Sequence, residues 1–157
     1  MDETIDYQQT KSLFDIGWMV AILEGEGYFG LAKQLLPSHH YRYKPTIGIN
    51  NTSLKLIEQI EEILKKWQIG YWKSKRNFQY KKDQFLIVIQ GYKRGGKLLS
   101  IILPYLNAKK PQADILWNYI QYRKPLNNHD FCGEEEDSFY QRIKELNKKG
   151  KVSTTKH

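Results

Sequence analysis

Two carboxylates interleaved with two glycines form the part of this sequence best suited to chemistry. The segment Glu24-Gly25-Glu26-Gly27 follows an apolar stretch of helical periodicity and precedes a predicted strand. At the C-terminal end of a helix the macrodipole disfavours carboxylates by roughly 0.3–1 kcal/mol each. Acids kept in such an unfavourable position indicate a cation bound nearby.

The helix that carries these acids has small residues along one edge. Gly17, Ala21 and Gly25 are spaced four apart, so they lie on successive turns of the same side. Small side chains let two helix backbones approach closely. The edge is therefore predicted to contact another helix, which belongs either to a second copy of the chain or to the same chain.

Residues Met19 to Gly27 resemble, position by position, the nine-residue LAGLIDADG motif of homing endonucleases. Ala21 stands in place of the first glycine, and both acids are glutamates. The resemblance implies a fold in which helices cover one side of a saddle-shaped antiparallel sheet. Because the sequence holds one copy of the motif, it also implies a homodimer, with Gly17, Ala21 and Gly25 at the interface.

The elements that must position the acids are predicted from hydrophobic periodicity and turn residues. They form an α+β domain of order α-β-β-α-β-β-α with additional helices over residues 1–150, followed by a disordered tail at 151–157. Helices are expected at about 11–25, 54–67, 98–106, 112–123 and 134–148, and strands at about 28–34, 43–50, 71–76 and 84–90. Trp67, Trp72 and Trp117 are assigned to the core.

One face of the predicted sheet is polar and could read DNA. Apolar residues alternate with Lys, Gln, Asn and Thr along the strands, as in a sheet with one buried face. Such side chains recognise base edges in the major groove. The predicted base contacts are Gln34, Lys44, Thr46, Asn50, Lys73, Lys75, Gln84 and Gln90. Arg42 and Arg76 are placed in loops, where they would contact phosphates.

The charge distribution supports a polyanionic partner. The chain has a net charge of +8, but residues 1–29 carry −5 and residues 30–127 carry +13. A basic middle segment is typical of nucleic-acid binding, and the alternative is a solubilising lysine-rich surface. The single cysteine, Cys132, excludes an intrachain disulfide and a cysteine-based zinc cluster. No apolar run approaches the ~20 residues that span a bilayer.

The resemblance also implies roles for individual residues. Glu26 would be the metal ligand, with help from the Gly25 carbonyl, and the metal would be Mg²⁺ or Mn²⁺. Glu24 is the alternative ligand, but the resemblance implies that the first acid more often has a structural role at the end of the helix. Lys109 stands three residues before Gln112-Ala113, the position of a catalytic-pocket lysine in single-motif family members. Ser53 is a candidate for ordering catalytic solvent, although helix capping explains it better.

These inferences converge on a homodimeric, metal-dependent, site-specific endonuclease. It would cut both strands of a long pseudo-palindromic DNA duplex, and the resemblance implies that it leaves 3′ overhangs. A maturase that binds intron RNA with the same fold is the main alternative, and a DNA-binding regulator without cleavage is the third. The expected location is an organelle or a prokaryotic cytoplasm, without secretion.

Overall fold

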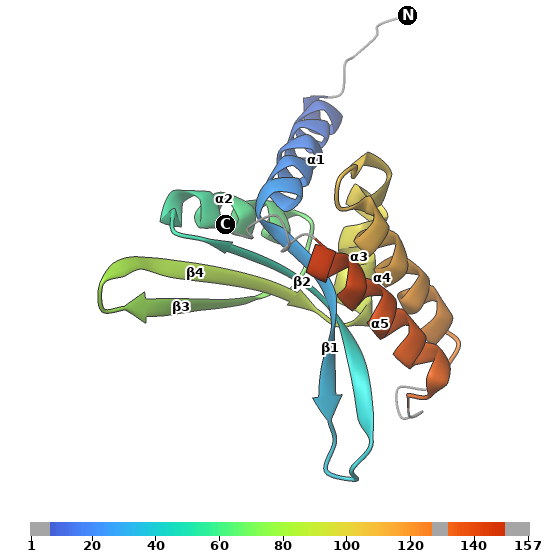
Figure 1. The fold of residues 1–157 in the computed structure, drawn as a ribbon. Helices are drawn as coiled ribbons and strands as arrows, with labels where there is room; N and C mark the ends of the chain where they lie inside the picture. Colours follow the sequence, from blue (N-terminus) through green and yellow to red (C-terminus); the bar gives the residue numbers. More distant parts are fainter. Residues whose placement is uncertain (1–6, 127–131, 150–157) are drawn as a thin grey trace, which may run out of the picture.

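The computed structural model describes residues 7–126 and 132–149, which form an α+β domain (Figure 1). The predicted order α-β-β-α-β-β-α is confirmed, with helices added after it. The elements are α1 (Tyr7–Glu26), β1 (Gly27–Leu35), β2 (Tyr41–Asn51), α2 (Leu54–Lys66), β3 (Trp72–Phe78), β4 (Lys81–Gln90), α3 (Tyr92–Ile102), the 3₁₀ turn η1 (Leu103–Tyr105), α4 (Lys110–Arg123) and α5 (Glu134–Lys149).

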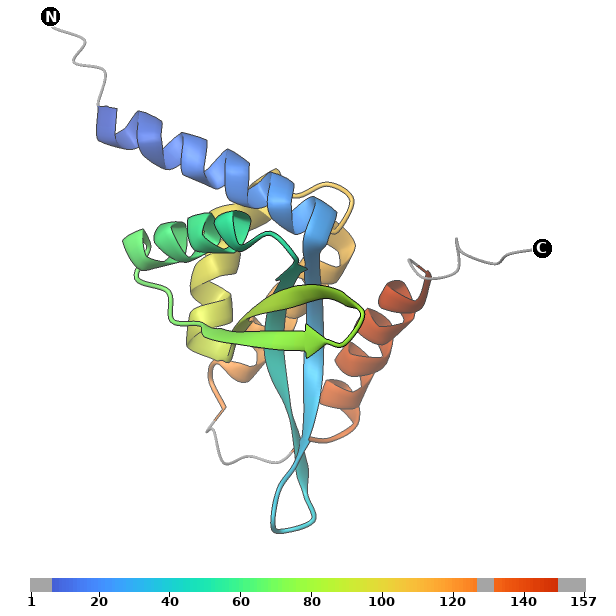
Figure 2. The same ribbon diagram turned by 90° about the vertical axis from the view of Figure 1, so that its left-hand side faces the viewer.

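The four strands form one antiparallel sheet of order β1-β2-β4-β3, so two hairpins are joined through β2 and β4. The register places Ile47 opposite Phe29 on one side and Ile89 on the other. These three side chains are at most 1% exposed, which confirms the predicted apolar face of β1, β2 and β4. The helices gather on this face, while the hairpins spread apart in different directions (Figures 1 and 2).

Helix α3 starts earlier than the sequence indicated. The sequence predicts a helix from about residue 98, but α3 begins at Tyr92 and includes Gly95 and Gly96. Gly95 is buried where α3 packs on the sheet, and a Cβ there would make an ordinary van der Waals contact of 3.5 Å with the Cβ of Pro45 in β2. Packing against β2 therefore outweighs the low helix propensity of glycine.

The predicted faces of β3 are wrong. Lys73 and Lys75 pair with Ile87 and Phe85, so they project on the helix side of the sheet. There Lys73 Nζ lies 2.6 Å from Glu61 Oε1 of α2, and Lys75 Nζ lies 3.0 Å from Asp83 Oδ2. The two lysines pair with these carboxylates, and the opposite face of β3 carries Trp72, Ser74 and Arg76.

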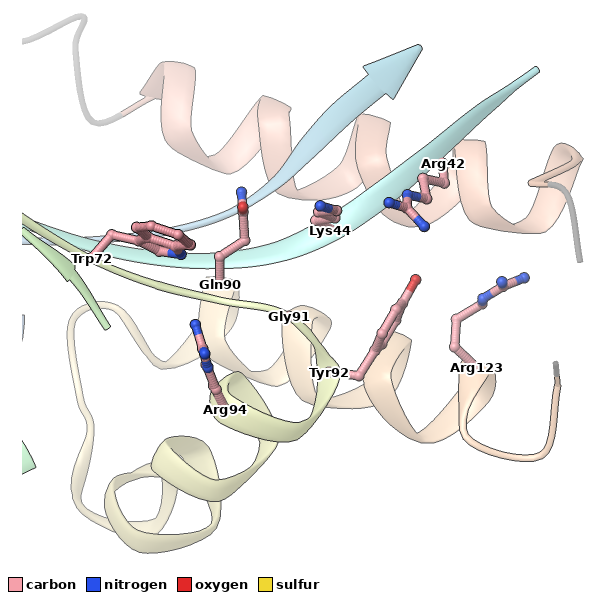
Figure 3. A pocket seen from close by; sticks show the side chains of 8 residues that line it. All are labelled: Arg42, Lys44, Trp72, Gln90, Gly91, Tyr92, Arg94 and Arg123. Atoms are coloured by element: carbon pink, nitrogen blue, oxygen red, sulfur yellow. The ribbon is translucent and has the colours of Figure 1, made fainter. Parts of the chain in front are cut away.

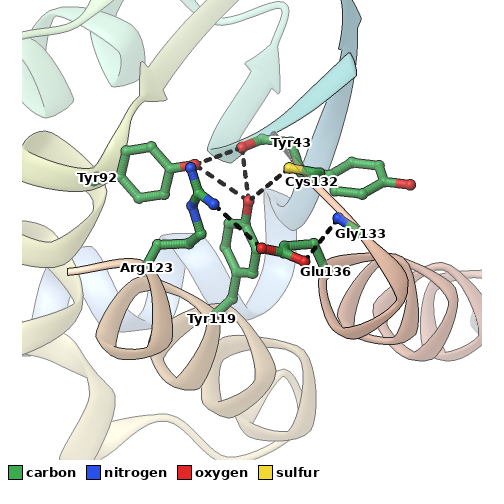
Figure 4. Close-up of polar contacts among 7 residues, drawn as sticks. All are labelled: Tyr43, Tyr92, Tyr119, Arg123, Cys132, Gly133 and Glu136. Carbon is green, nitrogen blue, oxygen red and sulfur yellow. Dashed lines mark hydrogen bonds and ion pairs between the residues drawn. The ribbon is translucent and has the colours of Figure 1, made fainter. Parts of the chain in front are cut away.

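Helix α5 is fastened to the sheet and to α4 by polar groups (Figure 4). Arg123 of α4 donates to Glu136 at 3.2 Å, and both side chains are at most 6% exposed. The hydroxyl of Tyr119 donates to the Tyr43 carbonyl at 3.0 Å. The Tyr43 and Tyr41 hydroxyls both donate to Asp137, and these bonds, led by that of Tyr43, lower the pKa of its carboxyl. Because a buried ion pair leaves an uncompensated charge when one partner is lost, the network holds α5 in one position.

The predicted tail at 151–157 and most of the connector before α5 lie outside the described residues. Within residues 7–126 and 132–149, no helix is long and apolar enough to cross a membrane.

Candidate functional site

The acidic segment lies where α1 passes directly into β1. Glu26 is the last residue of the helix, its side chain is exposed, and Gly27 is the first residue of the strand. A Cβ at Gly27 would lie 2.5 Å from the backbone oxygen of Leu23, closer than any side chain tolerates. The final glycine of the motif is therefore needed for the strand to leave the helix end so sharply.

Glu24 fastens a distant loop to the end of α1. Its carboxylate accepts backbone N–H groups of Asn107, Ala108 and Lys109 at 2.5, 2.8 and 3.3 Å. A carboxylate that accepts several backbone N–H groups makes strong, charge-assisted bonds. Glu24 is thus committed to a structural role, as the resemblance implied for the first acid, and the loop it holds carries Lys109.

Replacing Glu24 with glutamine is expected to lower the free energy of unfolding by about 2 kcal/mol, because bonds to a charged acceptor contribute ~1.5–3 kcal/mol and the amide offers one acceptor oxygen. Urea denaturation measures the change. Glu58→Gln, at an exposed position of α2, serves as the control and should be neutral. A Glu24→Gln protein as stable as the wild type would show that the loop is held by other contacts.

Lys109 reaches back to the end of α1. Its Nζ donates to the Gly27 carbonyl, and its side chain is partly buried. Burial lowers the pKa of the Lys109 ammonium, while the nearby Glu24 and Glu26 carboxylates oppose that shift. Gln112 lies in the first turn of α4, and Ala113 is fully buried in the core. The lysine and the acids, 83 or more residues apart in sequence, therefore share one site.

Glu26 and Lys109 line a common open hollow next to the junction of α1 and β1. Its other walls include Asn50, Asn51 and Gln84, whose side chains carry amide oxygens. Carboxylate and amide oxygens are hard ligands, and Mg²⁺ needs only one or two protein carboxylates because it keeps most of its waters. The residues therefore fit a divalent cation, although within the described residues no three acidic, histidine or cysteine side chains converge on one point.

Ser53 caps helix α2. Its Oγ accepts the N–H of Leu56 at 3.3 Å, and its own N–H donates to Asn51 Oδ1 at 2.8 Å. The preferred interpretation of Ser53 as a helix cap is confirmed, and its role toward solvent stays a prediction.

Eight of the ten predicted DNA contacts share the sheet face that points away from the helices. We call this face the reading face; its predicted members are Gln34, Arg42, Lys44, Thr46, Asn50, Arg76, Gln84 and Gln90. Arg42 and Arg76 lie within strands, not in loops as expected. Cross-strand hydrogen bonds join Arg42 to Gln34 at 3.0 Å, Asn50 to Gln84 at 3.2 Å and Gln90 to Thr46 at 3.2 Å. These bonds pair six of the eight side chains with a neighbour on the same face.

Trp72 is a member of the reading face that the sequence did not reveal. It was assigned to the core, but it pairs with Val88 on the open side of the sheet and is 67% exposed. Trp67 and Trp117 are partly buried against the core, as expected. The side of the sheet on which Trp72 lies depends on how β3 pairs with β4. Only the strand register could therefore have placed Trp72 on the reading face.

The small-residue edge of α1 is open. Gly17, Ala21 and Gly25 are exposed, and a Cβ at either glycine would meet no atom within 4 Å. Packing of this edge against another helix of the same chain is therefore wrong for the described residues. Phe14, one turn before Gly17, is 69% exposed. The N-terminal part of α1 projects beyond the other helices (Figure 1). The edge remains available to a second molecule.

The fold matches solved structures although the sequence matches no protein-family model and no curated protein. The homing endonuclease I-CvuI, solved with the I-CreI DNA target, has a TM-score of 0.61 at 16% identity, over 93% of this chain and 86% of that one. The archaeal intron-encoded homing endonuclease I-Vdi141I, complexed with DNA, gives 0.53 at 14% identity, over 85% and 97%. The LAGLIDADG homing endonuclease I-SmaMI, bound to cleaved DNA, gives 0.53 at 16%, over 90% and 44%.

Proposed function

Because this chain has the fold of the LAGLIDADG homing endonucleases, we propose that it is a site-specific endonuclease that hydrolyses both strands of a DNA duplex. The observation that carries the proposal is the juxtaposition of two surfaces. The hollow of Glu26 and Lys109 shares Asn50 and Gln84 with the reading face. A duplex lying along that face would bring its backbone to the carboxylate and the lysine.

The composition of the reading face suits base recognition. Amide and cationic groups predominate, and no carboxylate lies on it among the described residues of the four strands. Amides bind adenine and cations bind guanine in the major groove, where a good bidentate contact contributes about 1–3 kcal/mol of discrimination. Leu86 and Val88 add apolar surface toward thymine methyl groups.

Glu26 would hold a divalent metal, Mg²⁺ or Mn²⁺, together with the Gly25 carbonyl. The metal would supply Lewis acidity and a nucleophile at neutral pH. Lys109, fixed by the Gly27 carbonyl and by the loop that Glu24 holds, would place a positive charge beside the scissile phosphate. Charge fixed in advance at that point stabilises the negative charge that develops during hydrolysis.

Two copies joined along Gly17, Ala21 and Gly25 would complete the site. An isologous interface places the same residues of both protomers at a twofold axis. Each protomer would then contribute one Glu26 beside the axis and one reading face to each half of a pseudo-palindromic target.

The proposal is tested by incubating the protein with a randomised duplex library in Mg²⁺ and sequencing the new ends. We expect cuts at one recurring sequence on both strands, leaving 3′ overhangs, and none when EDTA replaces the metal. Stable binding of duplex DNA without any cut would favour a regulator. Preference for intron RNA over duplex DNA across a salt series would favour a maturase.

A further inference from the structure

A second concave site lies at the rim of the reading face, where β4 ends and α3 begins. Its volume is about 420 Å³. In Figure 3 the sheet bounds it on one side through Lys44, Gln90 and Trp72, and α3 bounds it on the other through Tyr92 and Arg94. We call this hollow the rim pocket. None of its residues lines the hollow of Glu26 and Lys109.

The rim pocket is strongly cationic. Arg42, Lys44, Arg94 and Arg123 all line it, and none of its eight lining residues is acidic. Arg123 is paired with Glu136. No ion pair among the described residues includes Arg42, Lys44 or Arg94, and Arg42 donates a hydrogen bond to the neutral side chain of Gln34. Three positive charges therefore line one pocket without a compensating carboxylate, an arrangement that favours an anion.

The first turn of α3 adds to this positive field. The turn from β4 into α3 uses Gly91 at φ +108°, a conformation that a side chain strains, and no side chain caps the helix. The first turn contains Lys93 and Arg94 and no acid, although cations are disfavoured beside the positive end of a helix dipole. A bound anion would relieve this repulsion.

The side chain of Arg94 is positioned to contact an anion in the rim pocket. Its guanidinium lies against Gly70, since a Cβ there would come within 2.7 Å of Arg94 Nε. Figure 3 shows the side chain rising from α3 toward Gln90 and Trp72. A guanidinium matches phosphate oxygens in a bidentate manner, and the exposed indole of Trp72 offers a flat apolar surface for a sugar.

We propose that the rim pocket binds one phosphate of the DNA backbone through Arg94, while Lys44 and Arg42 on the opposite wall add to the positive field of the pocket. This inference rests on the proposed function, because Lys44, Gln90 and Trp72 belong to the reading face that would lie along the duplex. The contact is independent of sequence. It fixes the position of the duplex against α3, a helix outside the sheet.

The test compares Arg94→Gln with Lys93→Gln. Both residues are exposed in the first turn of α3, and each substitution removes one positive charge, but Lys93 does not line the rim pocket. Affinity for a labelled random-sequence duplex is measured by fluorescence anisotropy in EDTA over a salt series. Arg94→Gln should weaken binding by about tenfold and reduce the slope of log affinity against log salt by about 1, the value for one phosphate contact. Lys93→Gln should stay close to the wild type.

If both variants lost the same amount of affinity for duplex DNA, the proposed phosphate contact in the rim pocket would be refuted, because the loss would reflect net charge alone. An unchanged slope for Arg94→Gln would overturn it as well. In both cases binding by the wild-type protein would leave the proposed function standing. A wild-type protein that binds no duplex at low salt would overturn both proposals.

Discussion

Replacing Glu26 with glutamine is expected to abolish DNA cleavage in Mg²⁺, by about a thousandfold or more, while the affinity for duplex DNA changes little. Glu26 is the exposed acid in the hollow that it lines with Lys109, whereas the Glu24 carboxylate accepts hydrogen bonds from three backbone N–H groups. An amide keeps the size of the side chain but loses the charge that would hold the metal. Several kcal/mol of metal-supplied stabilisation would be lost, and each 1.36 kcal/mol corresponds to tenfold in rate.

Single-turnover cleavage and anisotropy on the same duplex measure the two effects separately. Glu62→Gln removes an exposed glutamate of α2 that lies outside the hollow, and it should cut DNA at the wild-type rate. If the Glu26→Gln protein still cut DNA, the assignment of Glu26 as the metal ligand would be refuted. Loss of cutting and binding together would instead assign Glu26 a role in folding, which a thermal melt would reveal.

Placing arginine at Ala21 is expected to split the proposed dimer and abolish cutting of both strands. Ala21 is exposed midway along the open edge of α1, so the isolated protomer has room for a longer side chain there. In a dimer, however, the two arginines would meet near the twofold axis. Two like charges buried together at the interface would destabilise the dimer far more than the substitution destabilises the monomer.

Sedimentation velocity should therefore show a species near the protomer mass of 18.7 kDa for Ala21→Arg and one of twice that mass for the wild type. Ser12→Arg is the matched control. Ser12 lies nine residues earlier on the same helix, half a turn around its axis from Ala21, and it is also exposed. It should stay dimeric and active. A wild-type protein that sediments at 18.7 kDa at cleavage concentrations would contradict the proposed interface.

Those parts of the fold that repeat a strong local pattern could be predicted from the sequence. Ile47 and Ile49 of β2 alternate with Thr46, Gly48 and Asn50, so the buried face of this strand follows from the local pattern. Residues 85–89 of β4 are all apolar, and the pairing of Ile87 and Ile89 with Ile49 and Ile47 shows which of them are buried. Strand β3 has no such pattern, because all of its residues are exposed. Its faces are set only by pairing with β4, and a shift of one residue inverts them. For this reason Lys73 and Lys75 were placed on the wrong face.

The candidate site divides in the same way. Glu26 was identifiable because its motif is contiguous, and Lys109 because it stands at a fixed offset from Gln112-Ala113. The hydrogen bonds from the 107–109 loop to Glu24 join residues more than 80 positions apart, and no local sequence pattern predicts them. The rim pocket likewise is lined by residues of β2, β3, β4, α3 and α4, so its existence depends on tertiary packing that periodicity does not encode.

The attachment of α5 has a consequence for biosynthesis. The β1–β2 hairpin is backed by a helix encoded roughly a hundred residues later: Tyr41 donates to Asp137, and Asn147 donates to the carbonyl of Phe29. At translation rates of about 5–20 residues per second, the hairpin waits several seconds on the ribosome for that support. A nascent chain halted after α4 already contains Glu26 and Lys109 but lacks α5. The sheet thus gains its full backing only after the residues of the proposed site have been synthesised, so the described fold is complete only when α5 has been translated.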